Sequence, residues 1–169
     1  MNRKKHPSQS ILKSYVNSAP YHLIFITFIM GILYFQAWAK DPAPATKVGI
    51  SITGFHSLKG NVLINLFTAP EGFPDKTNLA FQNIILSVTN NIMTNMFTNV
   101  PYGPCAVAAV HDENGNMKMD KTFLGKPKEG YGVSLNAPPS RMGPPSFDNA
   151  VFTLTSEGTN ISIVLIYPE

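Results

Sequence analysis

Apolar and polar residues alternate in a series of short runs after residue 46, and this period-two pattern limits the fold more than any other feature. It is clearest at residues 47–55, where Val48, Ile50 and Ile52 take every second position. Successive side chains of a β-strand point to opposite faces, so such alternation is typical of strands with one buried face. No run after residue 46 repeats its apolar residues with the 3.6-residue period of a helix. The pattern therefore predicts an all-β domain.

Turn signals separate seven runs of this kind. They lie at residues 47–55, 61–67, 79–89, 92–100, 105–111, 150–156 and 161–167. Many short strands with regular turns are typical of a β-sandwich, so we expect seven strands within residues 47–167. The run 161–167 is apolar on both faces, which predicts a central strand.

The first 39 residues have the layout of a secretory signal peptide. The basic residues come first, at Arg3, Lys4, Lys5 and Lys13. An apolar run follows at residues 23–35, and Ala37 and Ala39 then make a small-x-small cleavage site. We expect cleavage after Ala39, with residues 40–46 forming a Pro/Ala linker.

The alternative for this segment is an uncleaved membrane anchor. The run from Tyr21 to Ala39 is just long enough to span a bilayer, which needs about 20 residues. Its basic flank would stay in the cytoplasm. Both alternatives place residues 40–169 outside the cytoplasm, in the periplasm, secreted, or anchored to the inner membrane. Membrane contact is expected only through the N-terminal segment.

The charge and the cysteine content limit which partners and which covalent bonds we expect. After Ala39 the chain has nine basic and ten acidic residues, a net charge of −1. This balance does not indicate a nucleic-acid partner, which would need a clustered basic face. Cys105 is the single cysteine, so no internal disulfide is expected, and it is predicted to be a small buried apolar residue.

The segment "HDENGNMKMD", residues 111–120, places oxygen-bearing groups at alternate positions. On an EF-hand frame the ligands would be Asp112, Asn114, Asn116, Lys118 through its carbonyl, and Asp120. Met117 stands where such loops carry Gly, and Phe123 where they carry a bidentate Glu. A calcium site in this loop would therefore be weak, with a dissociation constant of about 10⁻⁴–10⁻³ M. The alternative is a turn built on Asn114-Gly115.

The connection over residues 112–149 is far longer than an ordinary loop. Its candidate recognition residues are Glu129, Tyr131, Arg141 and Phe147, because aromatic and Arg side chains favour binding hot spots. The alternative is that Tyr131 and Phe147 anchor the loop onto the sandwich. His111 is not expected to bind zinc, since no second His or Cys stands at ligand spacing, and it is predicted to form hydrogen bonds at a strand end.

Enzyme signatures are not present in the sequence. There is no G-x-S-x-G elbow, and Asp120 stands where a phosphate-binding loop before Gly125-Lys126 would require Gly. Cys105 and His111 fall on one predicted strand, about 20 Å apart, too far for a nucleophile and its base. We expect no catalytic residues.

Three segments carry a family resemblance. "GNVLINLFTAPEGFPD", "FTNVPYGPCAVAAVHDENGNMKMDKTFLGKPKEGYG" and "GPPSFDNAVFTL" resemble a bacterial family of exported proteins, the domain-of-unknown-function family twenty-one forty-one. The resemblance covers about residues 47–167. It implies a transthyretin/prealbumin-type Greek-key sandwich. Cys105 replaces the Tyr of such domains, and Met117 replaces the Gly common in the acidic loop. The family implies no reaction.

These observations favour a monomeric, exported, non-enzymatic binding module with an unidentified envelope or extracellular ligand. A weak calcium site in the 112–120 loop is the one cofactor site that this interpretation leaves open. The first alternative is a structural or accessory cell-envelope protein with no metal site. An unrecognised hydrolase is the least favoured.

Overall fold

The computed structural model describes residues 44–140 and 143–168. The expected signal segment at residues 1–39 lies outside this range, as does Arg141. The strands are β1 (Ala45–Thr53), β2 (Asn61–Phe67), β3 (Gln82–Ser87), β4 (Ile92–Pro101), β5 (Gly103–Asp112), β6 (Gly130–Val133), β7 (Phe152–Leu154) and β8 (Thr159–Val164). The remaining elements are the 3₁₀ turns η1 (Thr77–Leu79) and η2 (Ser134–Asn136) and the short helix α2 (Phe147–Ala150). None of the helices in the described ranges has the length and hydrophobicity that a membrane span requires.

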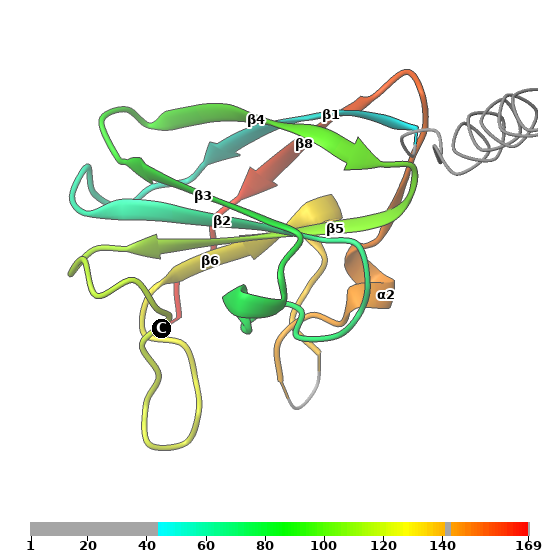
Figure 1. Cartoon of the computed structure of the whole chain (residues 1–169). Coiled ribbons are helices and arrows are strands. Elements are labelled where there is room, and N and C mark those ends of the chain that lie inside the picture. The colour runs from blue at the N-terminus through cyan, green and yellow to red at the C-terminus, as the bar shows by residue number, and fades with distance from the viewer. Residues whose placement is uncertain (1–43, 141–142, 169) are drawn as a thin grey trace, which may run out of the picture. The chain divides into compact units, whose positions relative to one another are not determined.

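The strands form two sheets (Figure 1). In the first, β1 lies between antiparallel β4 and parallel β8. The second has the order β3-β2-β5-β6 with antiparallel neighbours, and β7 pairs with the start of β5. Just after β8, Ile166 and Tyr131 of β6 exchange two backbone hydrogen bonds of 2.8 and 2.9 Å. These bonds join the two sheets along one edge.

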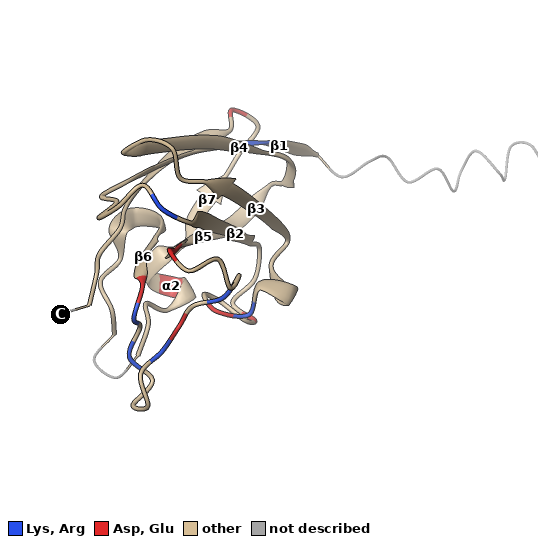
Figure 2. Ribbon diagram, turned by 90° about the vertical axis from the view of Figure 1, so that its left-hand side faces the viewer, with Lys and Arg blue, Asp and Glu red and all other residues tan. Residues whose placement is uncertain are grey.

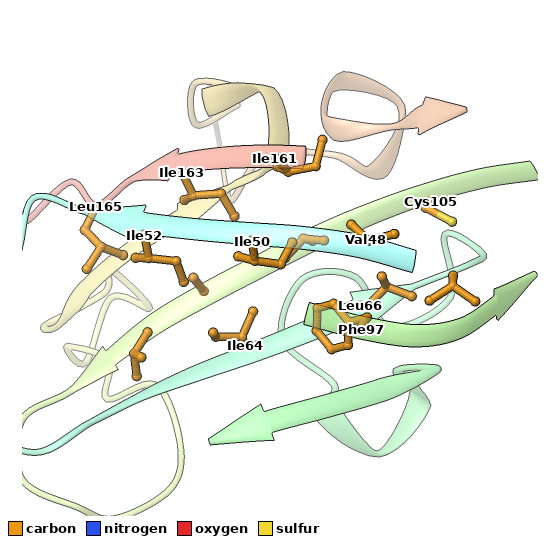
Figure 3. Packing of buried hydrophobic residues seen from close by; sticks show 14 of the residues in the cluster. Val48, Ile50, Ile52, Ile64, Leu66, Phe97, Cys105, Ile161, Ile163 and Leu165 are labelled. Carbon is orange, nitrogen blue, oxygen red and sulfur yellow. The ribbon is translucent and has the colours of Figure 1, made fainter. Parts of the chain in front are cut away.

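The main core lies between the sheets (Figure 3). Val48, Ile50 and Ile52 of β1 point toward Ile64 and Leu66 of β2, and all five side chains are almost fully buried. Because period-two alternation sends every second side chain of β1 to this face, the predicted pattern and the observed core agree. Both sheets therefore depend on the same apolar cluster.

A second, smaller cluster covers the outer face of the second sheet. Ala106 and Ala108 of β5 point away from the main core and pack with Phe67, Phe147 and Ala150. This explains why the stretch 105–109 is buried at every position: β5 is covered on both faces. Among the described residues, the strand pairings and both clusters fall within residues 45–167, so this part of the chain forms one compact unit.

The all-β prediction is confirmed, with two sheets, but three details are wrong. The described residues hold eight strands rather than seven, because β6 lies inside the long connection. The run 161–167 is not central: β8 is an edge strand whose burial alternates, with Ile163 fully buried and Val164 48% exposed. β1 begins at Ala45, inside the expected linker.

Candidate functional site

The acidic loop is organised by the buried carboxylate of Asp112 at the end of β5. Its Oδ1 accepts hydrogen bonds from the N–H groups of Gly115 (2.8 Å) and Asn116 (3.1 Å), and its Oδ2 accepts one from Met117 (2.8 Å). Asp112 is fully buried, so these amides replace the water that an ionised carboxylate needs. In this arrangement both oxygens of the predicted first calcium ligand are engaged by the backbone.

The next predicted ligands also hold the loop together. Asn114 Oδ1 accepts from the Asn116 N–H (3.0 Å), and Asn116 Oδ1 accepts from the Lys118 N–H (3.0 Å). Asn114 Nδ2 donates to Asp120 Oδ2 (2.7 Å). These short-range bonds are the local side-chain-to-backbone contacts typical of Asn and Asp in turns. They account for the predicted turn at Asn114-Gly115 and draw Asp120 to it.

Glu129 lies beneath this loop and is only 6% exposed. Its Oε2 accepts a hydrogen bond from the Asp120 N–H (3.0 Å), whereas its Oε1 has no hydrogen-bond partner. Burial raises the pKa of the Glu129 carboxyl above its ordinary value, and the carboxylates of Asp112 and Asp120 raise it further. The amides of Asp120 and Glu113 oppose this rise, although the Glu113 N–H does not complete a hydrogen bond to Oε1. A buried carboxylate oxygen without a donor is unusual and would be satisfied by a proton or a cation.

Among residues 44–140 and 143–168, no three His, Cys, Asp or Glu side chains are arranged to hold a metal ion. A calcium site here would instead combine Asp120 and Glu129 with amide and carbonyl oxygens of the loop, which is chemistry that calcium accepts. The 112–120 calcium site therefore stays a prediction.

His111 forms the expected hydrogen bonds at the end of its strand. It is fully buried, with Nε2 2.8 Å from the Lys59 carbonyl oxygen and Nδ1 2.6 Å from Tyr167 Oη. Tyr167 Oη also accepts from the His56 N–H (3.1 Å), and the His56 ring stacks on the Tyr167 ring. Both ring nitrogens of His111 are thus used inside the fold.

The described residues that were predicted for recognition, Glu129, Tyr131 and Phe147, do not form one exposed surface. Phe147 is 8% exposed and packs edge-to-face against Phe73 at a ring-centroid distance of 5.7 Å, so it is an anchor of the outer cluster. Glu129 is buried under the acidic loop. Tyr131 is half-buried, and burial raises the pKa of its hydroxyl. Of the described candidates, only Tyr131 reaches a concave surface.

That surface is a cleft of about 610 Å³ over the outer face of the second sheet. Ala108 and Val110 of β5 form part of its floor together with Tyr131, Gly132 and Val133 of β6. One wall comes from residues 119–127, and the described part of the other comes from prolines and small residues at 139–140 and 143–144. Small-molecule sites in proteins have volumes of about 300–1,000 Å³. The cleft could not be found from the sequence, because no local pattern shows which loops will stand on either side of a sheet.

Cys105 is fully buried in the main core, as predicted. Burial raises the pKa of its thiol, so the reactive thiolate form is disfavoured.

Comparison with known proteins identifies a family. A family model described as "Uncharacterized protein conserved in bacteria (DUF2141)" matches residues 50–162, which is more than half of the chain. No curated protein and no solved structure matches the chain. The family resemblance is confirmed, whereas the transthyretin-type likeness and the Greek-key connectivity stay predictions.

Proposed function

The chain belongs to this family of uncharacterised bacterial proteins, and on that premise we propose that it is a non-enzymatic binding domain whose cleft holds a small ligand. The single observation that carries the proposal is the 610 Å³ cleft over β5 and β6. Its size is that of a small-molecule site, and its floor is formed mainly by apolar groups.

The lining indicates the chemistry of the ligand. Val110, Val133 and Leu124 offer apolar contacts, and Lys121 and Lys126 stand on the wall that residues 119–127 form. Lys121 forms an ion pair with Asp75, which also lines the cleft. A ligand with an apolar body and an anionic end fits this combination, since the body would cover the floor and the charge would meet Lys126.

We propose that the domain acts outside the cytoplasm as a monomer, after cleavage of the leader or while anchored by it. The alternative is a structural or accessory cell-envelope protein in which the cleft has no ligand. An unrecognised hydrolase is least favoured, and no side chains of the described residues support a catalytic proposal.

The test is titration of residues 40–169 with a fluorescent fatty acid. We expect saturable binding that Val110→Asp weakens about tenfold or more, because the new carboxylate would be desolvated by the ligand's apolar body. The matched control is Ile85→Asp, since Ile85 is 55% exposed and lies on β3, outside the cleft. Equal binding by both variants and the unchanged chain would refute the proposal that the cleft is the binding site, and it would favour the structural alternative.

The acidic loop is a second candidate site, and the unpartnered Glu129 Oε1 is the observation that favours it. We propose weak Ca²⁺ binding in which Asp120 and Glu129 supply the charge and the 112–118 segment supplies further oxygens. Calorimetric titration with Ca²⁺ after chelator treatment should show millimolar binding that Asp120→Asn or Glu129→Gln abolishes. Exposed Glu157→Gln is the control. No heat from the unchanged chain at millimolar Ca²⁺ would reduce the loop to a turn.

A further inference from the structure

The segment after the acidic loop folds into a narrow hairpin, which we call the finger (residues 118–128). The Lys128 N–H donates to the Asp120 carbonyl (2.8 Å), and the Thr122 N–H donates to the Lys126 carbonyl (2.8 Å). A turn closes the hairpin, with the Gly125 N–H donating to the Thr122 carbonyl (2.9 Å) and Gly125 at a positive φ of 79°. The finger is the long loop that projects from the sheets at the lower left of Figure 1.

Two apolar residues stand at the tip of the finger. Phe123 is 104% exposed and Leu124 is 81% exposed, the two highest values among the exposed large apolar side chains. Next in that group is Ile92 at 60%. Side chains of this kind usually cover some neighbouring surface, so an apolar pair held clear of the domain indicates an interaction site.

Lysines flank this tip on both arms of the finger, at positions 118, 121, 126 and 128. Figure 2 shows them as blue segments on the two arms, with a tan tip between them. Asp120 is the single acidic residue of the finger, and its carboxylate accepts a hydrogen bond from Asn114 (2.7 Å). The finger thus carries an excess of three positive charges, whereas the rest of the chain after residue 39 has five basic and nine acidic residues, a net charge of −4.

We propose that the finger docks the domain onto an anionic phospholipid surface, a membrane contact in addition to the one expected from the N-terminal segment. Phe123 and Leu124 would enter the boundary between headgroups and acyl chains, and the lysines would lie at the headgroup level. Aromatic and leucine side chains next to lysines are the usual combination of proteins that bind in the membrane interface. Each lysine near an anionic surface contributes about fivefold in affinity.

The shape of the site favours a bilayer over a protein partner. The finger is convex and its tip is apolar on a turn, so a protein would need a concave apolar pocket rimmed with acidic groups. A fluid anionic bilayer offers the same chemistry without a preformed pocket. Charge is a second reason. Both arms of the finger carry lysines, and a planar anionic surface can contact the lysines of both arms simultaneously.

This docking uses some of the residues that line the cleft, but an experiment can separate it from the cleft proposal. Leu124, Lys121 and Lys126 also line the cleft, whereas Phe123 and Lys128 do not. Variants at Phe123 and Lys128 therefore test the membrane contact while leaving the cleft lining unchanged.

The first experiment is co-sedimentation of residues 40–169 with vesicles of phosphatidylcholine alone or mixed with phosphatidylglycerol. We expect binding to the mixed vesicles only, weakened by salt. Phe123→Ser should weaken it about tenfold or more, because the apolar insertion is lost. Lys128→Glu should also weaken it by about tenfold or more, since it replaces attraction by repulsion. Ile92→Ser and Lys76→Glu are the matched controls, both at exposed positions outside the finger.

The second experiment reports insertion directly. The chain has one tryptophan, Trp38, which is absent from residues 40–169. Phe123→Trp then places a single tryptophan at the tip, and its emission should shift to the blue with anionic vesicles. Circular dichroism of each variant checks that it is folded.

Three results would overturn the proposal. The first is no binding of the unchanged domain to anionic vesicles. The second is binding that Phe123→Ser and Lys128→Glu leave at the level of the controls. The third is tryptophan emission from the Phe123→Trp variant that stays unshifted while this variant sediments with the vesicles.

Discussion

At the scale of single residues, Tyr167 completes the hydrogen bonding of a buried histidine. The Lys59 carbonyl can only accept, so His111 Nε2 donates to it, and in the neutral ring Nδ1 accepts from the Tyr167 hydroxyl. Tyr167→Phe leaves Nδ1 without a donor and the His56 N–H without its acceptor. We expect a loss of about 1–3 kcal/mol in the free energy of unfolding, measured by urea denaturation. Tyr102→Phe, at a 41% exposed position, should change nothing, and an equal effect of the two variants would contradict this account.

Glu129 makes stability depend on pH in a direction opposite to that of most carboxylates. Its folded pKa is raised above the ordinary value of 4.5. At a pH between the ordinary pKa and the raised pKa of the folded state, the folded state keeps a proton that the unfolded state has lost. The free energy of unfolding therefore falls as pH rises through this window and stays lower above it. Glu129→Gln should therefore raise the melting temperature at pH 7 and have less effect near pH 4, measured by calorimetry without Ca²⁺. A lower melting temperature of Glu129→Gln at pH 7 would contradict this account, because it would show that the charged Glu129 carboxylate stabilises the fold. Glu157→Gln, at an exposed position, is the control.

At the scale of elements, the strands that could be predicted are those whose burial is decided locally. β2 has the predicted bounds, and β1 begins two residues before its predicted start. Both strands could be predicted because every second residue of each faces the core. β6 could not be predicted, since Gly130 and Gly132 are poor strand residues by themselves. They are needed because the C-terminal segment lies against them: a Cβ on Gly130 would meet the Tyr167 ring at 2.4 Å, and one on Gly132 would meet Ile163 at 2.6 Å.

The layer on the outer face of the second sheet gives the element-scale prediction. Phe147 of α2 fills the cluster that Phe73 and Ala108 complete, so its role is packing rather than recognition. Phe147→Ala should lower the free energy of unfolding by about 3–5 kcal/mol in urea denaturation. Phe123→Ala, at the fully exposed tip of the finger, should change it by less than about 0.5 kcal/mol. A small effect at Phe147 would return this residue to the set of recognition candidates.

At the scale of the whole molecule, the candidate sites depend on which segments the fold brings together. The acidic loop could be found in the sequence because its oxygens alternate over ten residues, 111–120. The orphan oxygen of Glu129 could not, because its burial comes from the fold. The cleft could be predicted even less, since it joins β5 and β6 to loop residues at 119–127, 139–140 and 143–144. The finger is intermediate between these cases. The sequence shows Phe123 and Leu124 among lysines, but only the structure shows that no described residue covers them.

The main core also predicts how the domain unfolds. Its side chains come from both sheets, with Val48 and Ile50 on one side and Ile64 and Leu66 on the other, so neither sheet keeps a buried face without its partner. The Tyr131–Ile166 pair joins the sheets along an edge as well. We therefore expect residues 40–169 to unfold in urea as one cooperative unit, with coincident transitions by far-UV circular dichroism and tyrosine fluorescence. The outer cluster shares β5 with the main core, so Phe147→Ala should move both transitions together rather than separate them. If the variant instead lost the fluorescence signal before the circular dichroism signal, the outer layer would be an independent unit, and the cleft it borders would open without unfolding of the sandwich.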